Sequence, residues 1–236
     1  MKSGSFSKSE FIRGMVAAIP ISVGYMPIAI AFGVIAVQSG IPPFSSASMS
    51  LMVYAGASQF MGVNMIMTGA GFAEIVLAVF VLNLRHFVMS MSVMHDLKHI
   101  KKEWKPILAF GITDETFAVL SMKEREQGNV MNPGFVAGLM ATAYASWVAG
   151  TIVGGIFADY IPSSISSSMA IGLYAMFVGL LIPAVKGSWK AGIIVAASII
   201  LCTVLGNFLE RGWAIVLATV IAASAGIFLL KEDQTV

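Results

Sequence analysis

The chain has 236 residues, of which 58% are apolar and only 11% are charged. Soluble domains carry about 25% charged residues, so this composition and a mean hydropathy of +0.87 indicate an integral membrane protein in a lipid bilayer. The net charge of +2 is small and the basic residues lie between apolar runs, which argues against a nucleic-acid partner. The single cysteine, Cys202, excludes an internal disulfide framework.

Hydrophobic runs that approach the roughly 20 residues of a membrane-spanning helix occur along the whole chain. They cover residues 12–37, 44–69, 72–94, 106–122, 134–158, 167–185, 190–209 and 213–230. We therefore expect an all-α integral membrane fold of seven to eight hydrophobic segments, in a single membrane domain over 1–236. The longest polar stretch, 95–105, is predicted to form a helix at the membrane interface.

The segment 44–69 departs from a plain membrane helix. It follows two prolines and a run of serines, and it places Gly56 and Gln59 where a lipid anchor would carry leucine. A backbone interrupted in this way is tolerated in hydrocarbon only where protein or a water-filled cavity covers it. We therefore predict a discontinuous or re-entrant segment around Tyr54.

An internal repeat suggests the architecture. A pattern of Ile-Pro, serines and Tyr-Ala occurs twice, at a constant offset of 120 residues. Its matched positions are Ile41 and Ile161, Ser46 and Ser166, and Tyr54 and Tyr174. We interpret it as two repeat halves of four segments each, about 1–120 and 121–236, although a small apolar alphabet also produces matches by chance.

Charge placement indicates how the halves are related. If the second segment of each half re-enters, ten Lys and Arg residues fall on the cytoplasmic side and only Lys123, Arg125 and Arg211 fall outside, with Arg85 in the membrane. Eight full crossings place eight inside and five outside, a poorer fit to the positive-inside tendency. Each half then crosses an odd number of times. This predicts two inverted repeats, a common build of secondary transporters, with cytoplasmic N- and C-termini.

Three polar side chains stand within one turn of the third segment: Asn83, Arg85 and His86. An arginine at membrane depth is costly unless it is paired or hydrated, so we expect a functional role for it. The alternative is that the long side chain of Arg85 snorkels to the membrane interface.

The fourth segment carries two adjacent carboxylates, Asp114 and Glu115. On a continuous helix that begins near Pro106, Asp114 would lie about 12 Å into the span. The two side chains would point about 100° apart, so that one faces Arg85 and the other a cavity. A buried carboxylate without a partner can hold a proton near neutral pH, which makes these two acids and His86 candidates for proton coupling. The alternative is a structural ion pair with Arg85.

Helix ends in the broken segments offer a place for an anion, because the exposed N–H groups of a helix N-terminus favour a carboxylate. The candidate substrate-binding residues are Ser46, Tyr54, Gln59, Asn83, Arg85, Ser166 and Tyr174. We expect Ser46 and Gln59 near the membrane midplane, facing the two candidates from the second repeat. Hydrogen bonding between helices is an equally good explanation of Gln59.

No paired-cysteine, phosphate-binding or Ser-His-Asp pattern is present, so we predict that the protein is not an enzyme and has no cofactor. His95 and His99 are spaced as a metal-binding pair, but they lie in a lysine-rich stretch and we expect no metal there. The sequence therefore favours transport over catalysis.

Four short motifs carry a resemblance to a known family: Gly-Tyr-Met-Pro-Ile-Ala at 24–29, Ala-Gly-Ala-Ser-Gln-Phe at 55–60, Asn-Leu-Arg-His at 83–86 and Thr-Asp-Glu-Thr at 113–116. Together they resemble the AzlC family, the large subunits of branched-chain amino-acid exporters. The resemblance implies export of leucine, isoleucine and valine, with methionine as a further candidate, across the bacterial cytoplasmic (inner) membrane. It also implies a small AzlD-type membrane subunit as partner.

We expect alternating access between the two halves, with proton coupling. The substrate carboxylate would lie near half-helix N-termini or Arg85, and its ammonium near Asp114 or Glu115. A passive channel-like permease for small solutes is the main alternative, and a membrane enzyme is a weaker one.

Overall fold

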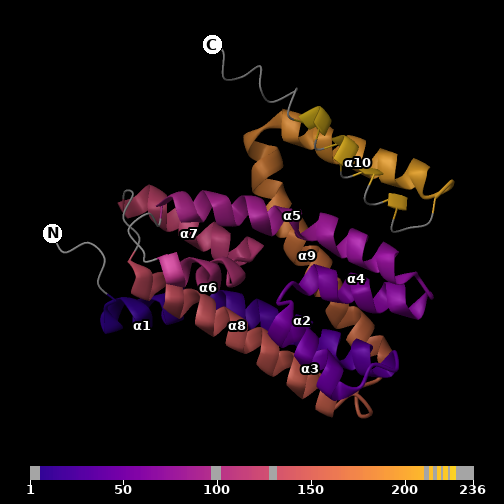
Figure 1. The fold of residues 1–236 in the computed structure, drawn as a ribbon, viewed down its shortest axis with the longest axis horizontal. Helices are drawn as coiled ribbons and strands as arrows, with labels where there is room; N and C mark the ends of the chain where they lie inside the picture. The colour runs from indigo at the N-terminus through magenta and orange to yellow at the C-terminus, as the bar shows by residue number, and fades with distance from the viewer. Residues whose placement is uncertain are drawn as a thin grey trace. The chain divides into compact units, whose positions relative to one another are not determined.

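The computed structural model describes residues 6–96, 102–127, 132–209 and parts of 213–226, and every regular element within them is helical (Figure 1). Three of the described helices are long and apolar enough to cross a membrane, at Ile19–Gln38, Phe72–Met94 and Pro133–Ile156. The prediction of an all-α membrane fold is confirmed for this part of the chain. The count of seven to eight segments stays a prediction.

The elements follow the predicted segments with several divisions. In chain order they are α1 (Lys8–Ala17), α2 (Ile19–Gln38), α3 (Pro43–Met52), α4 (Gly56–Met67), α5 (Phe72–Asp96), a 3-10 turn (Lys102–Trp104), α6 (Lys105–Phe110), α7 (Asp114–Gln127), α8 (Pro133–Ile156), α9 (Ser163–Gly187) and α10 (Trp189–Leu205). Of the predicted interfacial helix 95–105, residues 97–101 lie outside the described residues, and the last predicted segment, 213–230, is described only in part.

The chain forms two compact units, each of which draws on both predicted halves. The first comprises Met1–Phe60 and Asn83–Gly172, and the second comprises Met61–Leu82 and Leu173–Val236. In the second unit the end of α4 packs on the start of α5 through Met65, Ala78 and Val81. All of the polar contacts described below lie within the first unit.

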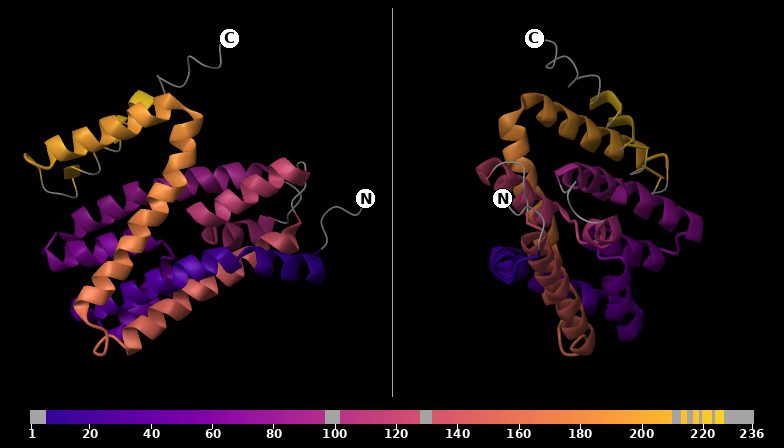
Figure 2. Two further views of the ribbon diagram at one scale, coloured as in Figure 1. Left: turned by 180° about the vertical axis from the view of Figure 1, so that it is seen from behind. Right: turned by 60° about the vertical axis from the view of Figure 1, so that its left-hand side comes forward.

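The core of the first unit is the packing of α8 against α1 and α2, which lie beside it in both views (Figures 1 and 2). α8 begins at Pro133 because the Asn132 side chain accepts a hydrogen bond from the Gly134 N–H at 2.8 Å. Glycines let the backbones approach: a Cβ added at Gly154 would overlap the backbone of Ile30 in α2. Small residues on facing helices are the usual means by which helices pack closely in membranes.

α8 runs in the same direction as α1 and α2. Gly14, in α1, lies against the backbone of Phe135 near the start of α8. At the other end, Gln38 Nε2 donates a hydrogen bond to the carbonyl of Ala158 at 3.1 Å. The first segments of the two predicted halves are therefore parallel, whereas inverted repeats require them to be antiparallel. For this pair of helices the prediction of inverted halves is wrong.

The charge count failed because it treated 106–122 as one full crossing. α6 and α7 instead form a broken segment, and Lys123 near the end of α7 returns to the start of α1. Its ammonium lies 3.9 Å from Glu10 Oε2 and 3.1 Å from the centroid of the Phe135 ring. Lys123 thus lies at the same end of the unit as Glu10, and not at the opposite end as the charge count required.

Because Lys123 lies beside Glu10, we expect the start of α1 and the end of α7 to lie on the same side of the membrane. In a Cys202→Ser background, we expect cysteines introduced at Ser9 and at Gln127 to be equally protected from a membrane-impermeant maleimide added to intact cells. Permeabilised cells give the control for reactivity. Labelling at position 127 but not at position 9 would contradict this arrangement and support the inverted topology.

The break predicted for the second segment of each half is present in only one of them. α3 ends at Met52 and α4 begins at Gly56, as expected for the first half. The corresponding α9 is continuous through Tyr174, so the discontinuity predicted there is wrong. The two copies differ just after Tyr-Ala, where Gly56 in the first is replaced by Met176 in the second, and methionine favours helix far more than glycine does.

Candidate functional site

The break between α3 and α4 is centred on Tyr54, as the sequence predicted. Its φ of 46° is the only positive value for a non-glycine residue in the described part of the chain. Such a conformation costs roughly 1–3 kcal/mol and persists only where its surroundings hold it. The Tyr54 ring is 3% exposed and packs on Tyr144 and Phe110, with centroid distances of 5.0 and 6.0 Å. Aromatic contacts therefore fix the break.

Four buried residues form a closed ring of hydrogen bonds that joins this break to α8, and the backbone carbonyl of Trp147 completes it. Trp147 Nε1 donates to Gln59 Oε1 at 3.0 Å, and Gln59 Nε2 donates to Ser50 Oγ at 2.8 Å. The Thr151 hydroxyl donates to the Trp147 carbonyl at 3.0 Å, so Ser50 must be the donor in its 2.7 Å bond to Thr151. These bonds run in one direction around the ring and reinforce one another.

Gln59 therefore makes helix-to-helix hydrogen bonds, the alternative that the sequence left open. The ring depends on close approach at Gly56, where an added Cβ would lie 2.5 Å from the Trp147 indole. A substrate-binding role for Gln59 stays a prediction. Sequence reasoning missed Ser50, Trp147 and Thr151, because each reads as an ordinary residue of an apolar helix.

A second break separates α6 from α7 at Gly111–Ile112–Thr113. The Thr113 N–H donates to Thr116 Oγ1 at 2.8 Å, and the Thr116 N–H donates to Thr113 Oγ1 at 3.3 Å. This reciprocal pair is a capping box, in which threonine replaces the usual glutamate or glutamine. Asp114 is consequently the first residue of a new helix, and the prediction that it lies deep in a continuous helix is wrong. Gly111 followed by Thr-x-x-Thr is the signal that could have revealed the break.

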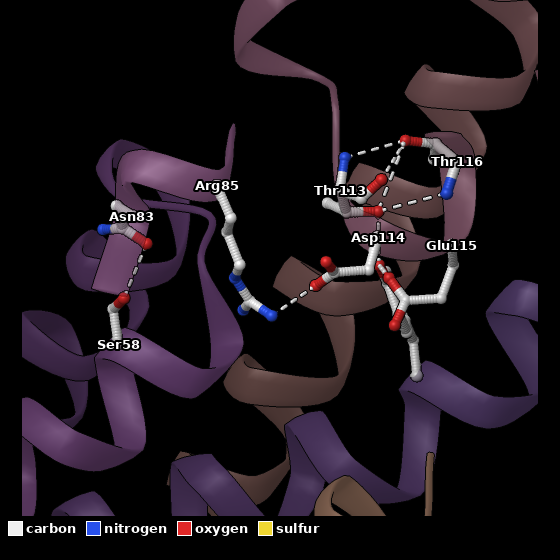
Figure 3. Close-up of polar contacts among 8 residues, drawn as sticks. Ser58, Asn83, Arg85, Thr113, Asp114, Glu115 and Thr116 are labelled. Atoms are coloured by element: carbon white, nitrogen blue, oxygen red, sulfur yellow. Dashed lines mark hydrogen bonds and ion pairs between the residues drawn. The ribbon is translucent and has the colours of Figure 1, made fainter. Parts of the chain in front are cut away.

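An ion pair joins α5 to the start of α7 (Figure 3). Arg85 NH1 lies 2.8 Å from Asp114 Oδ2, with 30% and 22% of the two side chains exposed. Two residues before Arg85, Asn83 Oδ1 accepts a hydrogen bond from the Ser58 hydroxyl at 2.7 Å, which ties α5 to α4. His86 lies within electrostatic range of both members of the ion pair.

Glu115 points to a different partner from Asp114. The hydroxyl of Tyr25, from the middle of α2, forms a short hydrogen bond with Glu115 Oε2 and lies 2.7 Å from Thr113 Oγ1. The Tyr25 ring is buried edge-on against Trp147, at 5.3 Å between centroids. Tyr25 thus connects the second break to the hydrogen-bonded ring. Sequence reasoning noted it only within a family motif, because nothing local distinguishes it from a packing tyrosine.

The two breaks adjoin each other. Tyr54 from the first packs on Phe110 just before the second, and it lies within electrostatic range of Glu115 and Tyr25. Its hydroxyl is buried and has no hydrogen-bond partner among the described residues. The broken segments that face each other are therefore α3–α4 and α6–α7, a pairing that the repeat did not predict.

The remaining candidates are Ser46, Ser166 and Tyr174. The Ser46 hydroxyl donates to the Pro43 carbonyl at 2.9 Å, at the start of α3, and the residue is fully buried. Ser166 lies on α9, but its side chain is outside the described residues. Tyr174 is 66% exposed and belongs to the second unit. Their predicted binding roles, and the facing arrangement with Ser46 and Gln59, stay predictions.

The chain is a helical membrane protein with a polar site surrounded by apolar helices. That site is the junction of the two helix breaks, with its ion pair and buried hydroxyls. The chain belongs to the AzlC family, because the family model described as AzlC protein matches residues 20–161. The resemblance seen in the sequence motifs is confirmed.

Relatives support the membrane assignment. The chain is 32% identical to an uncharacterized membrane protein of Archaeoglobus fulgidus, over 97% of this chain and 98% of that one. It is 29% identical to the inner membrane protein YgaZ of Escherichia coli, over 74% and 73%. It is 27% identical to the branched-chain amino acid transport protein AzlC of Bacillus subtilis, over 61% and 56%. No solved structure matches the chain.

Proposed function

We propose that this protein exports branched-chain amino acids across the cytoplasmic membrane by alternating access, with proton coupling. The observation that carries the proposal is the Arg85–Asp114 pair at the junction of two helix breaks. Ionisable groups at membrane depth are costly and usually mark a transport pathway. The Bacillus subtilis relative, named a branched-chain amino acid transport protein, supports the choice of substrate.

The ion pair matches the two charges of an amino-acid zwitterion. The substrate carboxylate would bind the Arg85 guanidinium and the substrate ammonium would bind the Asp114 carboxylate, so that each charge keeps a partner when the pair opens. The unpartnered Tyr54 hydroxyl is a further polar contact at the junction. The rings of Tyr54, Phe110 and Tyr144 pack together beside it and supply an apolar surface for a branched side chain.

The test is transport by purified protein in liposomes. We expect labelled leucine, isoleucine and valine to exchange across the membrane, and we expect lysine and glutamate to fail because each adds a buried charge without a partner. A proton gradient, acidic outside, should drive leucine out against its concentration gradient. Downhill movement only would favour the passive permease. No leucine movement above that of empty liposomes, either with this chain alone or with the small subunit described below, would refute the proposal.

We also propose that the protein works with a small AzlD-type membrane subunit in the inner membrane, with both termini cytoplasmic. This partner is what the resemblance of the sequence motifs to the AzlC family implies. Liposomes containing this chain alone should be compared with liposomes that also contain an apolar protein encoded beside it. Equal leucine exchange in the two preparations would show that the chain needs no partner.

A further inference from the structure

Asp114 and Glu115 are adjacent in sequence but have different surroundings. Asp114 faces the Arg85 guanidinium at 2.8 Å, so a proton added to Asp114 would break this partly buried ion pair. Glu115 instead contacts the neutral Tyr25 hydroxyl, and in the described part of the chain no cationic side chain contacts its carboxylate. Changing the charge of Glu115 therefore breaks no ion pair.

We propose that Glu115, and not Asp114, carries the transported proton, and that Tyr25 relays its protonation to the cap of α7 at Thr113. This inference rests on the proposed function, because it assigns the coupling group of that same site. It separates two tasks that the sequence could not separate: Asp114 and Arg85 hold the substrate charges, while Glu115 holds the proton.

The relay follows from counting protons on the Tyr25 hydroxyl, which has one proton and two close partners. A charged Glu115 carboxylate only accepts, so Tyr25 donates to it and accepts from the Thr113 hydroxyl. A protonated Glu115 donates to Tyr25, which then donates to Thr113 Oγ1. One proton bound at Glu115 thus reverses both hydrogen bonds, and no other proton is gained or lost.

The reversal reaches the second helix break through Thr113. With Glu115 charged, Thr113 gives its proton to Tyr25 while its Oγ1 accepts the Thr116 N–H. With Glu115 protonated, Oγ1 accepts from Tyr25 as well, and the Thr113 proton must turn toward Thr116 Oγ1, 3.3 Å away. The Thr116 hydroxyl is also bonded to the Gly111 carbonyl at 3.2 Å. The proton therefore changes the contacts that hold α7 against the end of α6.

Other titratable and charged groups face Glu115 from each neighbouring element. Asp114 precedes it on α7, Tyr25 comes from α2, and Tyr54 comes from the break between α3 and α4. On α5, Arg85 and His86 face Asp114. Among these, only Tyr25 forms a hydrogen bond with the Glu115 carboxylate from another helix, which makes it the relay.

The experiment measures leucine exchange and leucine-driven proton flux in the same liposomes, with a pH-sensitive dye inside. We expect Glu115→Gln to keep exchange and to lose proton flux, while Asp114→Asn loses both. The matched control is Glu74→Gln, which changes a glutamate of the second unit and should keep both. Undiminished proton flux in Glu115→Gln, or proton flux lost with exchange intact in Asp114→Asn, would overturn the assignment.

The relay has its own test. Tyr25→Phe removes the hydroxyl and keeps the ring, so we expect exchange to persist and to lose its dependence on pH. The control is Tyr160→Phe, because Tyr160 is 81% exposed and contacts neither acid. Equal pH profiles for these two variants would refute the relay.

The assignment of the proton to Glu115 can still be tested if Glu115→Gln fails to fold. If Glu115→Gln gives no exchange, Glu115→Asp keeps the charge but shortens the reach to Tyr25, and it should exchange leucine with weakened proton flux; full flux would refute the relay. Wild-type protein that exchanges no leucine, alone or with the small membrane subunit, would refute the proposed function itself. Wild-type exchange together with unchanged proton flux in Glu115→Gln would refute only this inference.

Discussion

Replacing Arg85 with alanine is expected to reduce leucine export by at least about 100-fold. Arg85→Ala removes the partly buried guanidinium that the substrate carboxylate would bind. Loss of one member of a hydrogen-bonded charge pair costs about 3 kcal/mol of binding free energy, and each 1.36 kcal/mol is about tenfold. The same loss is expected for Asp114→Asn. Export is measured as the release of labelled leucine from preloaded cells, normalised to the amount of inserted protein.

A double variant separates a substrate-binding pair from a structural one. Arg85→Met with Asp114→Leu removes both charges and keeps the volume, a change that often leaves stability unaltered. We expect this variant to insert and to elute as a single species, without export. Restored export would mean that the pair only holds α5 to α7, which is the structural alternative that the sequence left open.

The second large effect concerns the packing of α8 on α2. Gly154→Leu would force a side chain into the backbone of Ile30, and overpacking costs about 1–3 kcal/mol even where neighbours can shift. Because a backbone cannot move aside as a side chain does, we expect a large fall in the melting temperature of the detergent-solubilised protein, or failure to accumulate.

The matched control for that variant is Gly179→Leu in α9. No atom lies within 4 Å of a Cβ built at Gly179, so the substitution meets open space and should leave the melting temperature close to wild type. Similar melting temperatures for the two leucine variants would contradict the close approach of α2 and α8.

Local signals in the sequence predicted local features well. The break at Tyr54 followed from small and polar residues in an apolar run, and the cost of an intramembrane arginine singled out Arg85. The pairing of Arg85 with Asp114 was one of the two possibilities that the adjacent carboxylates offered. The break was confirmed because it depends on residues that are near one another in the chain. The ion pair was confirmed because a buried charge carries a strong energetic penalty. The functional role of Arg85 stays a prediction.

Contacts between distant segments could not be predicted in the same way. Tyr25 meets Glu115 across 90 residues, and Trp147 meets Gln59 across 88, with no periodicity to indicate either contact. The direction of α8 was also missed, because the charge count assumed an unbroken helix through Gly111. A capping pair of threonines indicates a helix break less strongly than proline does, so the sequence did not predict the break between α6 and α7.

The parallel direction of α8 also bears on which helix breaks form the site. Facing half-helices were expected from the two copies of the repeat, at Tyr54 and Tyr174. That these two copies face each other stays a prediction. Within the first compact unit, the structure brings the first break against a second one, at Gly111–Thr113. The charged residues of the third and fourth segments therefore surround the same junction that Tyr54 helps to form.

Leucine counterflow by purified protein in liposomes tests the central claim most directly. Liposomes loaded with unlabelled leucine should take up labelled leucine when they contain the wild-type chain together with the small membrane subunit, and uptake should fall to the level of empty liposomes with Arg85→Ala. Equal counterflow by the two proteins would contradict a substrate site at the Arg85–Asp114 pair.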